Sequence, residues 1–412
     1  MQKYEEIIVG LDIGTTKICA VVGEISQNEI NIIGIGTYSS KGLKKGVVVD
    51  IESTVASIKK AVEEAELMAG CEIRDVYVGI AGSHISGFNS HGIIAIKGSE
   101  KGSEVLKQDI DRVIEAARAV AIPTDREIVH VLPQGYAVDY QKGIQNPVGM
   151  TGVRLEADVH IVTGSVTSVR NIVKCANRAG LDVKDIVLES IASSEAVVMK
   201  EEKALGTALI DMGGGTTDLA VFYDNNIKHT FVLPLGGNNL TNDIAIGFAA
   251  PLAEAEIIKK KYGTCISRNI SKDEIIEVPG LGGRHPRKLS RQILGEILEP
   301  RVEEIFLLIK KELNRVNIVS SMPSSIVITG GTSLLNDSVD LAESVFGVPV
   351  RLGSPIGISG LTDVVNNPMY ATGVGLVLYG SKNQPPDNFE VSDSNFIKKT
   401  LNRMKMWFKE IL

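Results

Sequence analysis

Two short glycine-rich stretches of this sequence combine residue types that can bind a phosphate group. "DIGTTK" begins at Asp12 and "DMGGGTTD" begins at Asp211, and each lies between two apolar runs that are typical of buried β-strands. Glycines let backbone N–H groups approach a phosphate without interference from a Cβ atom, and threonine hydroxyls add further donors. One such stretch could be only a tight hairpin, but two copies favour a pair of phosphate-binding hairpins.

Charged side chains add further chemistry to these turns. Asp12 and Asp211 would repel a bound triphosphate unless a hydrated Mg²⁺ ion lay between carboxylate and phosphate, so the two aspartates predict a magnesium site reached through water. Lys17 can neutralise a phosphate charge directly. The residues expected to bind the phosphates are Gly14, Thr15, Thr16 and Lys17 in the first turn and Gly213, Gly214, Gly215 and Thr216 in the second.

The elements that must position these turns repeat along the chain. Apolar runs flank each turn, and a segment of alternating polarity follows each pair of runs, which indicates an internal duplication. Between 84 and 163 the pattern differs and predicts a compact inserted subdomain, with one helix and strand-like runs at 126–133, 135–140 and 158–164. Strands alternate with helical periodicity throughout, which favours an α/β architecture. The predicted helices are 50–69, 103–120, 165–179, 241–262 and 289–314.

Composition limits the class of protein. The 412 residues are 44% hydrophobic and 23% charged, which is typical of a globular protein with roughly two to four folding units. The net charge of −7 argues against binding to nucleic acid. Four dispersed cysteines without C-x-x-C spacing and six histidines without a ligand pattern predict reduced thiols and no zinc site. We expect a cytoplasmic protein without a signal peptide or a membrane-spanning helix.

The last residues follow a different pattern. The hydrophilic segment 381–395 has no periodicity and is expected to be a flexible linker. Residues 396–412 then place bulky apolar side chains on one helical face and mainly basic ones on the other, which predicts a helix that lies in an anionic membrane interface. Docking of this helix onto the protein's own core is the alternative. The residues assigned to the membrane are Phe396, Ile397, Leu401, Lys405, Trp407, Phe408, Lys409 and Ile411.

The ordered motifs resemble those of the actin-like ATPase-fold superfamily, in which two duplicated lobes bind a nucleotide between them. Both hairpins match its phosphate motifs, "DVKDIVLESIASSEAVV" resembles its connecting helix segment, and "SSIVITGGTSLL" resembles its adenosine motif. The resemblance implies ATP with Mg²⁺ as cofactors and an adenosine site at Gly330, Gly331 and Thr332. It also implies a catalytic role for Glu189 and Asp211 if ATP is hydrolysed, and the sequence leaves open whether it is.

A second, weaker part of the resemblance concerns the helix that contains "AEAEIIKKKYG". Glu256 and Lys259 match a pair that contacts the nucleoside in some members of the superfamily. Their i, i+3 spacing is equally typical of an exposed helical ion pair, which is the alternative interpretation.

Nearly the whole chain resembles the FtsA family of bacterial cell-division proteins. The insert, "LGGNNLTNDIAIGF", "RQILGEILEPRVEEIF", "NNPMYATGVGLVLYG" and the tail carry this resemblance. It implies polymerisation, contacts of the insert with later division proteins, and tethering of the tubulin-like protein FtsZ to the cytoplasmic face of the membrane at the division site. Arg287, Arg301 and Glu304 match the positions that bind the FtsZ C-terminal tail, and arginines suit an acidic peptide. Arg301 and Glu304 also fit a solvated helical pair.

The predicted fold class is therefore α/β, with an actin-like ATPase fold of two duplicated lobes around a nucleotide cleft, an inserted subdomain in the first lobe and a C-terminal amphipathic helix. Two functions of the same fold are the alternatives, an ATPase of pilus assembly and a small-molecule kinase. The expected divisions are 1–83, 164–195 and 365–380 for the nucleotide-binding part of the first lobe, 84–163 for the insert, 196–242 and 325–364 for that of the second lobe, 243–324 for the FtsZ-binding subdomain, 381–395 for the linker and 396–412 for the membrane helix.

Overall fold

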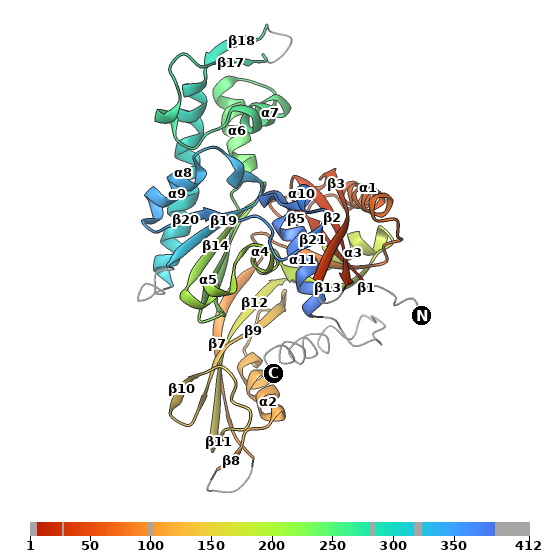
Figure 1. Cartoon of the computed structure of the whole chain (residues 1–412), viewed down its shortest axis with the longest axis vertical. Helices are drawn as coiled ribbons and strands as arrows, with labels where there is room; N and C mark the ends of the chain where they lie inside the picture. The colour runs from red at the N-terminus through yellow and green to blue at the C-terminus, as the bar shows by residue number, and fades with distance from the viewer. Residues whose placement is uncertain (1–5, 27–28, 98–101, 281–284, 317–323, 384–412) are drawn as a thin grey trace.

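The computed structural model describes residues 6–26, 29–97, 102–280, 285–316 and 324–383. Figure 1 shows two sheets side by side, with helices α6, α7 and α8 at one end of the long axis and the predicted insert at the other. The membrane helix predicted at 396–412 and most of the predicted linker lie outside the described residues. No helix in the described ranges is long and apolar enough to cross a bilayer.

The first sheet has six strands, in the order β13-β6-β1-β2-β3-β21. The first predicted hairpin is its centre, where β1 and β2 pair antiparallel, β3 pairs antiparallel with β2, and β6 joins β1 in parallel. The strands are β1 (Glu6–Ile13), β2 (Lys17–Ser26), β3 (Glu29–Ser39), β6 (Asp75–Ile80), β13 (Asp182–Leu188) and β21 (Ser359–Gly360). A small hairpin of β4 (Leu43–Lys44) and β5 (Val47–Val48) follows β3.

The second sheet repeats this plan, in the order β16-β15-β14-β19-β20. The second predicted hairpin pairs β14 with β15, β16 pairs antiparallel with β15, and β19 joins β14 in parallel. Its strands are β14 (Thr207–Met212), β15 (Thr217–Tyr223), β16 (Asn226–Leu233), β19 (Ser325–Thr329) and β20 (Val350–Leu352). The shared order of antiparallel and parallel neighbours agrees with the duplication predicted from the two turns.

Helices cover both sheets. α1 (Ile51–Ala69) begins after Asp50, whose side chain accepts a hydrogen bond from the Ser53 N–H, and ends at Gly70 in the left-handed conformation. The other first-lobe helices are α3 (Val166–Arg178), α4 (Glu189–Val197), α10 (Thr362–Val365) and α11 (Ala371–Lys382). The second lobe has α5 (Lys200–Leu205), α6 (Gly237–Phe248), α7 (Leu252–Tyr262), α8 (Arg291–Arg315) and α9 (Ser338–Phe346), with the hairpin of β17 (Ile275–Val278) and β18 (Arg287–Ser290).

One predicted helix is divided into two in the structure. The segment predicted as one helix at 241–262 belongs to two helices, α6 and α7. Ala249 ends α6 in the left-handed conformation with φ 46°, and Pro251 precedes α7 without an N–H that could continue the hydrogen-bond ladder. The helices predicted at 50–69, 103–120, 165–179 and 289–314 are confirmed as α1, α2, α3 and α8, with α2 shorter at both ends.

The insert is a four-stranded sheet, in the order β10-β9-β12-β7, with α2 packed against it and a hydrophobic core of its own. The runs predicted at 126–133 and 135–140 form one long strand rather than two. The register against β12 shifts between Pro133 and Gly135, so a β-bulge accommodates the proline inside this strand. The elements are β7 (Ser86–Ala95), β8 (Ser103–Glu104), α2 (Lys107–Arg118), β9 (Arg126–Val138), β10 (Gln141–Ile144), β11 (Thr151–Gly152) and β12 (Arg154–Ser165).

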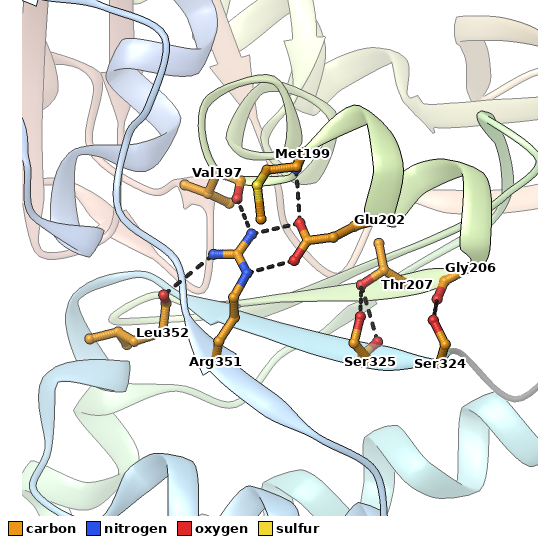
Figure 2. Close-up of polar contacts among 9 residues, drawn as sticks. All are labelled: Val197, Met199, Glu202, Gly206, Thr207, Ser324, Ser325, Arg351 and Leu352. Carbon is orange, nitrogen blue, oxygen red and sulfur yellow. Dashed lines mark hydrogen bonds and ion pairs between the residues drawn. The ribbon is translucent and has the colours of Figure 1, made fainter.

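The chain passes from the first lobe to the second through α4 and α5, and the guanidinium group of Arg351 binds both helices. Arg351, on the edge strand β20, forms two hydrogen bonds of 2.6 Å with the Glu202 carboxylate on α5 and one of 2.7 Å with the Val197 carbonyl at the end of α4 (Figure 2). A bidentate arginine contact of this kind fixes orientation as well as distance. The crossing from the first lobe is thereby attached to the second sheet.

Candidate functional site

The two predicted hairpins lie tip against tip. A Cβ atom added to Gly214 would collide with the side chain of Thr16, and one added to Gly215 would collide with that of Thr15. Glycine is therefore required at both places by the close approach of the first hairpin, independently of any ligand. The structure thus brings the two predicted phosphate-binding turns, from opposite halves of the chain, to one place.

Acidic side chains gather behind these tips. Asp12 is at the end of β1, Asp211 lies opposite Asp218 across the β14–β15 pair, and Glu189 is the first residue of α4. The exposed fractions are only 7% for Asp12 and Asp211 and 2% for Asp218. The structure therefore brings together Asp12, Glu189 and Asp211, as the sequence predicts, and adds Asp218, which the sequence analysis did not assign.

The ionisation of these acids reflects burial and mutual repulsion. Burial, with a smaller contribution from the charge of Asp211, raises the pKa of Asp12 to about 6 and that of Asp218 to about 8, although Lys17 partly offsets the rise at Asp12. The pKa of Glu189 is raised well above its usual value, first by burial and then by the charges of Asp12 and Asp218. Such a group of carboxyls favours a bound cation, which would offset the repulsion.

The residues fit a hydrated magnesium ion better than a metal held directly by protein ligands. Among the described residues, no group of three or more His, Cys, Asp or Glu side chains is arranged to hold a metal ion. However, the Oδ1 atom of Asp218 is buried without a hydrogen-bond partner, which a water molecule of a hydrated ion could satisfy. Mg²⁺ in nucleotide sites commonly keeps several waters and takes one or two carboxylates together with the phosphates.

Lys17 contacts a segment that precedes α11. Its Nζ donates a 2.5 Å hydrogen bond to the Met369 carbonyl and lies 4.3 Å from the centre of the Tyr370 ring. Met369 and Tyr370 belong to the short helix η5 (Pro368–Tyr370). The lysine predicted to bind phosphate therefore also links the first hairpin to the segment that leads into α11.

The predicted adenosine motif meets the second hairpin. Gly330, between β19 and η4 (Gly331–Leu334), has φ 86°, and a Cβ atom there would collide with Asp211 Oδ1. Thr332 Oγ1 donates a 2.8 Å hydrogen bond to the Gly213 carbonyl. In contrast, a Cβ atom on Gly331 would meet only the Met369 Cβ, at 3.9 Å, so this glycine borders open space.

Glu256 and Lys259 form the helical ion pair expected as the alternative, but the pair is partly buried rather than exposed. Lys259 is 7% exposed, and its Nζ lies 2.7 Å from Glu256 Oε2. It also donates hydrogen bonds of 2.9 Å to the Gly237 carbonyl and to Thr241 Oγ1. A Cβ atom on Gly237 would lie 2.5 Å from Thr332 Oγ1, so the pair is close to the adenosine motif.

Of the three predicted FtsZ-binding residues, Arg287 and Arg301 contact α6, and Glu304 contacts Arg301. Arg301 binds Asp243 through hydrogen bonds of 2.6 and 3.2 Å and also contacts Glu304, so the helical pair expected as the alternative is present. The Arg287 guanidinium donates to the Phe248 carbonyl at the end of α6. Between Asp243 and Phe248 in sequence, the side chain of Ile246 is 80% exposed, which places an apolar residue beside the charged ones.

Three polar residues of the site were missed by sequence reasoning. Asp218 closes the motif "DMGGGTTD", so its place opposite Asp211 could have been found from the symmetry of the hairpin. Ser193 and Thr372 bond to Asp211 across separations of 18 and 161 residues, for which the sequence carries no local signal. The predicted membrane residues from Phe396 to Ile411 lie outside the described part of the chain.

Comparison with solved structures shows the fold. The chain is similar to a PilM-PilN type IV pilus biogenesis complex, with 19% identity and a TM-score of 0.65 over 90% of this chain and 98% of the other. It is also similar to MreB5 of Spiroplasma citri bound to ADP, with 15% identity and a TM-score of 0.53 over 91% of this chain and 96% of the other. These likenesses confirm the actin-like ATPase fold predicted from the motifs.

Sequence comparison identifies the family within that fold. The family description "Cell division protein FtsA" matches residues 208–375, and "SHS2 domain inserted in FTSA" matches residues 82–163, where the insert was predicted. FtsA of Pseudomonas aeruginosa is 49% identical over 98% of this chain and 97% of its own length, and FtsA of Escherichia coli is 40% identical over 98% of each. The pilus-assembly and kinase alternatives are thereby set aside, and the chain belongs to the FtsA family of cell division proteins.

Proposed function

We propose that this protein binds Mg·ATP between its two hairpins, polymerises, and anchors FtsZ filaments to the membrane through residues 396–412. The observation that carries the nucleotide part is the meeting of both glycine-rich tips in front of Asp12, Asp211 and Asp218. A triphosphate supplies the oxygens that complete the coordination of a magnesium ion beside such carboxylates. The MreB5 structure bound to ADP has the same fold, which makes a nucleotide the natural ligand for this place.

Different residues are assigned to different parts of the nucleotide. Backbone N–H groups of Gly14 and Gly214 are offered to the phosphates at the hairpin tips. The N–H of Gly213 instead donates a 2.9 Å hydrogen bond to the Thr216 carbonyl and shapes the second turn. Gly331, which borders open space, leaves room for the purine and ribose. Glu189, the first residue of α4, is the residue that we assign to orient a water molecule, and slow hydrolysis and simple retention of ATP are both compatible with this assignment.

The interaction with FtsZ uses the surface around α6. Arg287 and Arg301 provide guanidinium groups for the acidic C-terminal tail of FtsZ, and the exposed Ile246 provides an apolar contact beside them. Because Arg301 is already paired with Asp243, the peptide must compete for this arginine. The insert, which has its own core, contributes to polymerisation and to contacts with later division proteins.

The membrane interaction uses the amphipathic segment 396–412. Five basic residues accompany its apolar face, and near an anionic leaflet each contributes about 1 kcal/mol. Such binding is reversible, as suits a peripheral protein at the division site.

The nucleotide part is tested by titration calorimetry of Asp211→Ala. Removal of the carboxylate should weaken Mg·ATP binding by roughly tenfold or more, since a charged contact to the hydrated ion is lost. Asp340→Ala is the matched control, because Asp340 is an exposed residue in the first turn of α9. Equal affinities for the Asp211 variant and the control would contradict the proposed site.

A further inference from the structure

The Asp211 carboxylate is held by two hydroxyl groups that do not come from its own sheet. Ser193 Oγ donates a 2.5 Å hydrogen bond to Asp211 Oδ2, and Thr372 Oγ1 donates one of 3.2 Å to the same oxygen. The two hydroxyl oxygens are 3.0 Å apart, and the exposed fraction of each of the three residues is 8% or less. Oδ2 is therefore occupied by protein donors, whereas Oδ1 lies on the side of Gly330.

The two hydroxyls come from helices that cross at direct backbone contact. Ser193 is on α4, which leads from the first lobe to the second, and Thr372 is in the first turn of α11. A Cβ atom on Gly375 would collide with the Ala192 carbonyl, so no side chain separates the helices there. Because this crossing leaves little freedom to either helix, the two hydroxyls are fixed relative to each other and to Asp211.

The neighbouring serine shows what a buried hydroxyl on α4 does when no carboxylate is near. Ser194 Oγ donates a 2.7 Å hydrogen bond to the Ile191 carbonyl of its own helix. This is the common use of a serine inside a helix. Ser193, one residue earlier, instead directs its hydroxyl across to the second sheet.

We propose that Ser193 and Thr372 are positioning residues, which hold Asp211 in the orientation that binds the hydrated metal ion of a bound nucleotide. This inference rests on the proposed function and deepens it. Aspartate carboxylates otherwise adopt a broad range of χ2 angles. With Oδ2 fixed by two donors, the carboxylate of Asp211 cannot rotate about this torsion. Oδ1 is then presented in one direction, as a preorganised ligand must be.

The test compares nucleotide affinity with and without the metal. Ser193→Ala and Thr372→Val remove the hydroxyls, Thr372→Ser retains one, and Ser194→Ala is the matched control on the same helix. We expect Ser193→Ala and Thr372→Val to bind Mg·ATP about tenfold more weakly, since a hydrogen bond to a charged group is lost. Binding of ATP in the presence of EDTA should change less than twofold, and Thr372→Ser and Ser194→Ala should match the wild type.

The outcomes separate this inference from the function on which it rests. A wild-type protein that binds no Mg·ATP overturns both. Normal wild-type binding that is weakened by Asp211→Ala but equal in Ser193→Ala, Thr372→Val and Ser194→Ala overturns only the positioning role. An equal loss with Mg²⁺ and with EDTA indicates a merely structural role and also overturns it. If Ser193→Ala unfolds in a thermal scan, the comparison of Thr372→Val with Thr372→Ser decides.

Discussion

The carboxyl groups of Asp12, Asp211 and Asp218 lie close enough to Glu189 for the charge of each to raise the pKa of Glu189, whose burial raises it most. Without a cation, these groups can lower their repulsion only by retaining protons. At the scale of the residue, the proposed nucleotide site is thus a place where the folded chain tolerates an unfavourable arrangement of charges. Arrangements of this kind are typical of binding and catalytic sites.

Two adjacent glycines of the adenosine motif should respond differently to substitution. Gly331→Val should weaken ATP binding by at least about tenfold with little change in thermal stability, because the new side chain enters open space rather than protein. Gly330→Ala should lower the free energy of unfolding by roughly 1–3 kcal/mol, because φ is positive there and the Cβ meets Asp211. Calorimetry and thermal unfolding measure the two effects.

The result for either variant can contradict this assignment. Retained ATP affinity in Gly331→Val would place the adenosine group elsewhere. Wild-type stability of Gly330→Ala would mean that the contact with Asp211 does not constrain this position.

Much of the site could be predicted because its main residues lie in local motifs. Asp12 and Asp211 begin the two turns, and the glycines that follow are explained by the contact between the tips. Ser193 and Thr372 could not be predicted, since a hydroxyl inside a helix has many possible partners until the tertiary structure selects one. The exposure of Glu256 and Lys259 was equally undetermined by i, i+3 spacing, because the same spacing suits a partly buried pair.

At the scale of the element, the insert docks on the edge strand β16 through polar contacts. His160 on β12 lies between Asn89 Oδ1, at 2.7 Å, and Thr230 Oγ1 on β16, at 2.8 Å. Gln134 donates to the backbone carbonyls of Ile227 and Lys228, and so satisfies acceptors on the free side of that strand. The edge of the second sheet is thereby covered by the insert.

The buried imidazole makes this docking sensitive to acid. Burial and the neighbouring His229 lower the pKa of His160 to about 3, whereas in the unfolded chain it is about 6.5. Above pH 6.5 the imidazole is neutral in both states and contributes no pH dependence. Between these values the unfolded state binds more protons, so the free energy of unfolding falls as the pH drops below 6.5. The loss approaches about 1.4 kcal/mol per pH unit.

Denaturant unfolding at pH 7.5, 6.5 and 5.5 measures the contribution of this histidine. His160→Gln, which stays neutral, should lose less stability between pH 6.5 and 5.5 than the wild type does. His285→Gln, at an exposed position, should follow the wild type. Parallel losses in the wild type and His160→Gln would show that the imidazole carries no such linkage.

The elements themselves were predictable where the periodicity was long. α1 and α8 follow their apolar patterns almost to the residue. The break between α6 and α7 was missed although Pro251 marks it, because the apolar periodicity continues on both sides. The strand β9 was divided in the prediction at Gln134, between Pro133 and Gly135, where the structure has a β-bulge within one strand.

At the scale of the whole molecule, the two lobes are tied together at the helix crossing. Glu195 on α4 accepts hydrogen bonds of 2.6 Å from Lys203 on α5 and from Lys382 at the end of α11. Although burial raises the pKa of Glu195, the charges of the two lysines lower it to about 2. α11 therefore runs from Thr372, which contacts Asp211, to a charged contact just before the segment that continues to the predicted membrane helix.

The central claim, that the protein joins FtsZ to the membrane, is tested most directly by co-sedimentation of a labelled FtsZ C-terminal peptide with anionic vesicles. We predict that the full chain carries the peptide into the pellet and that the emission of Trp407, its single tryptophan, shifts to the blue. Removal of residues 396–412 should abolish both, whereas Arg301→Ala should release the peptide and leave the protein on the vesicles. A full chain that stays in the supernatant, or that reaches the vesicles without the peptide, would contradict the account.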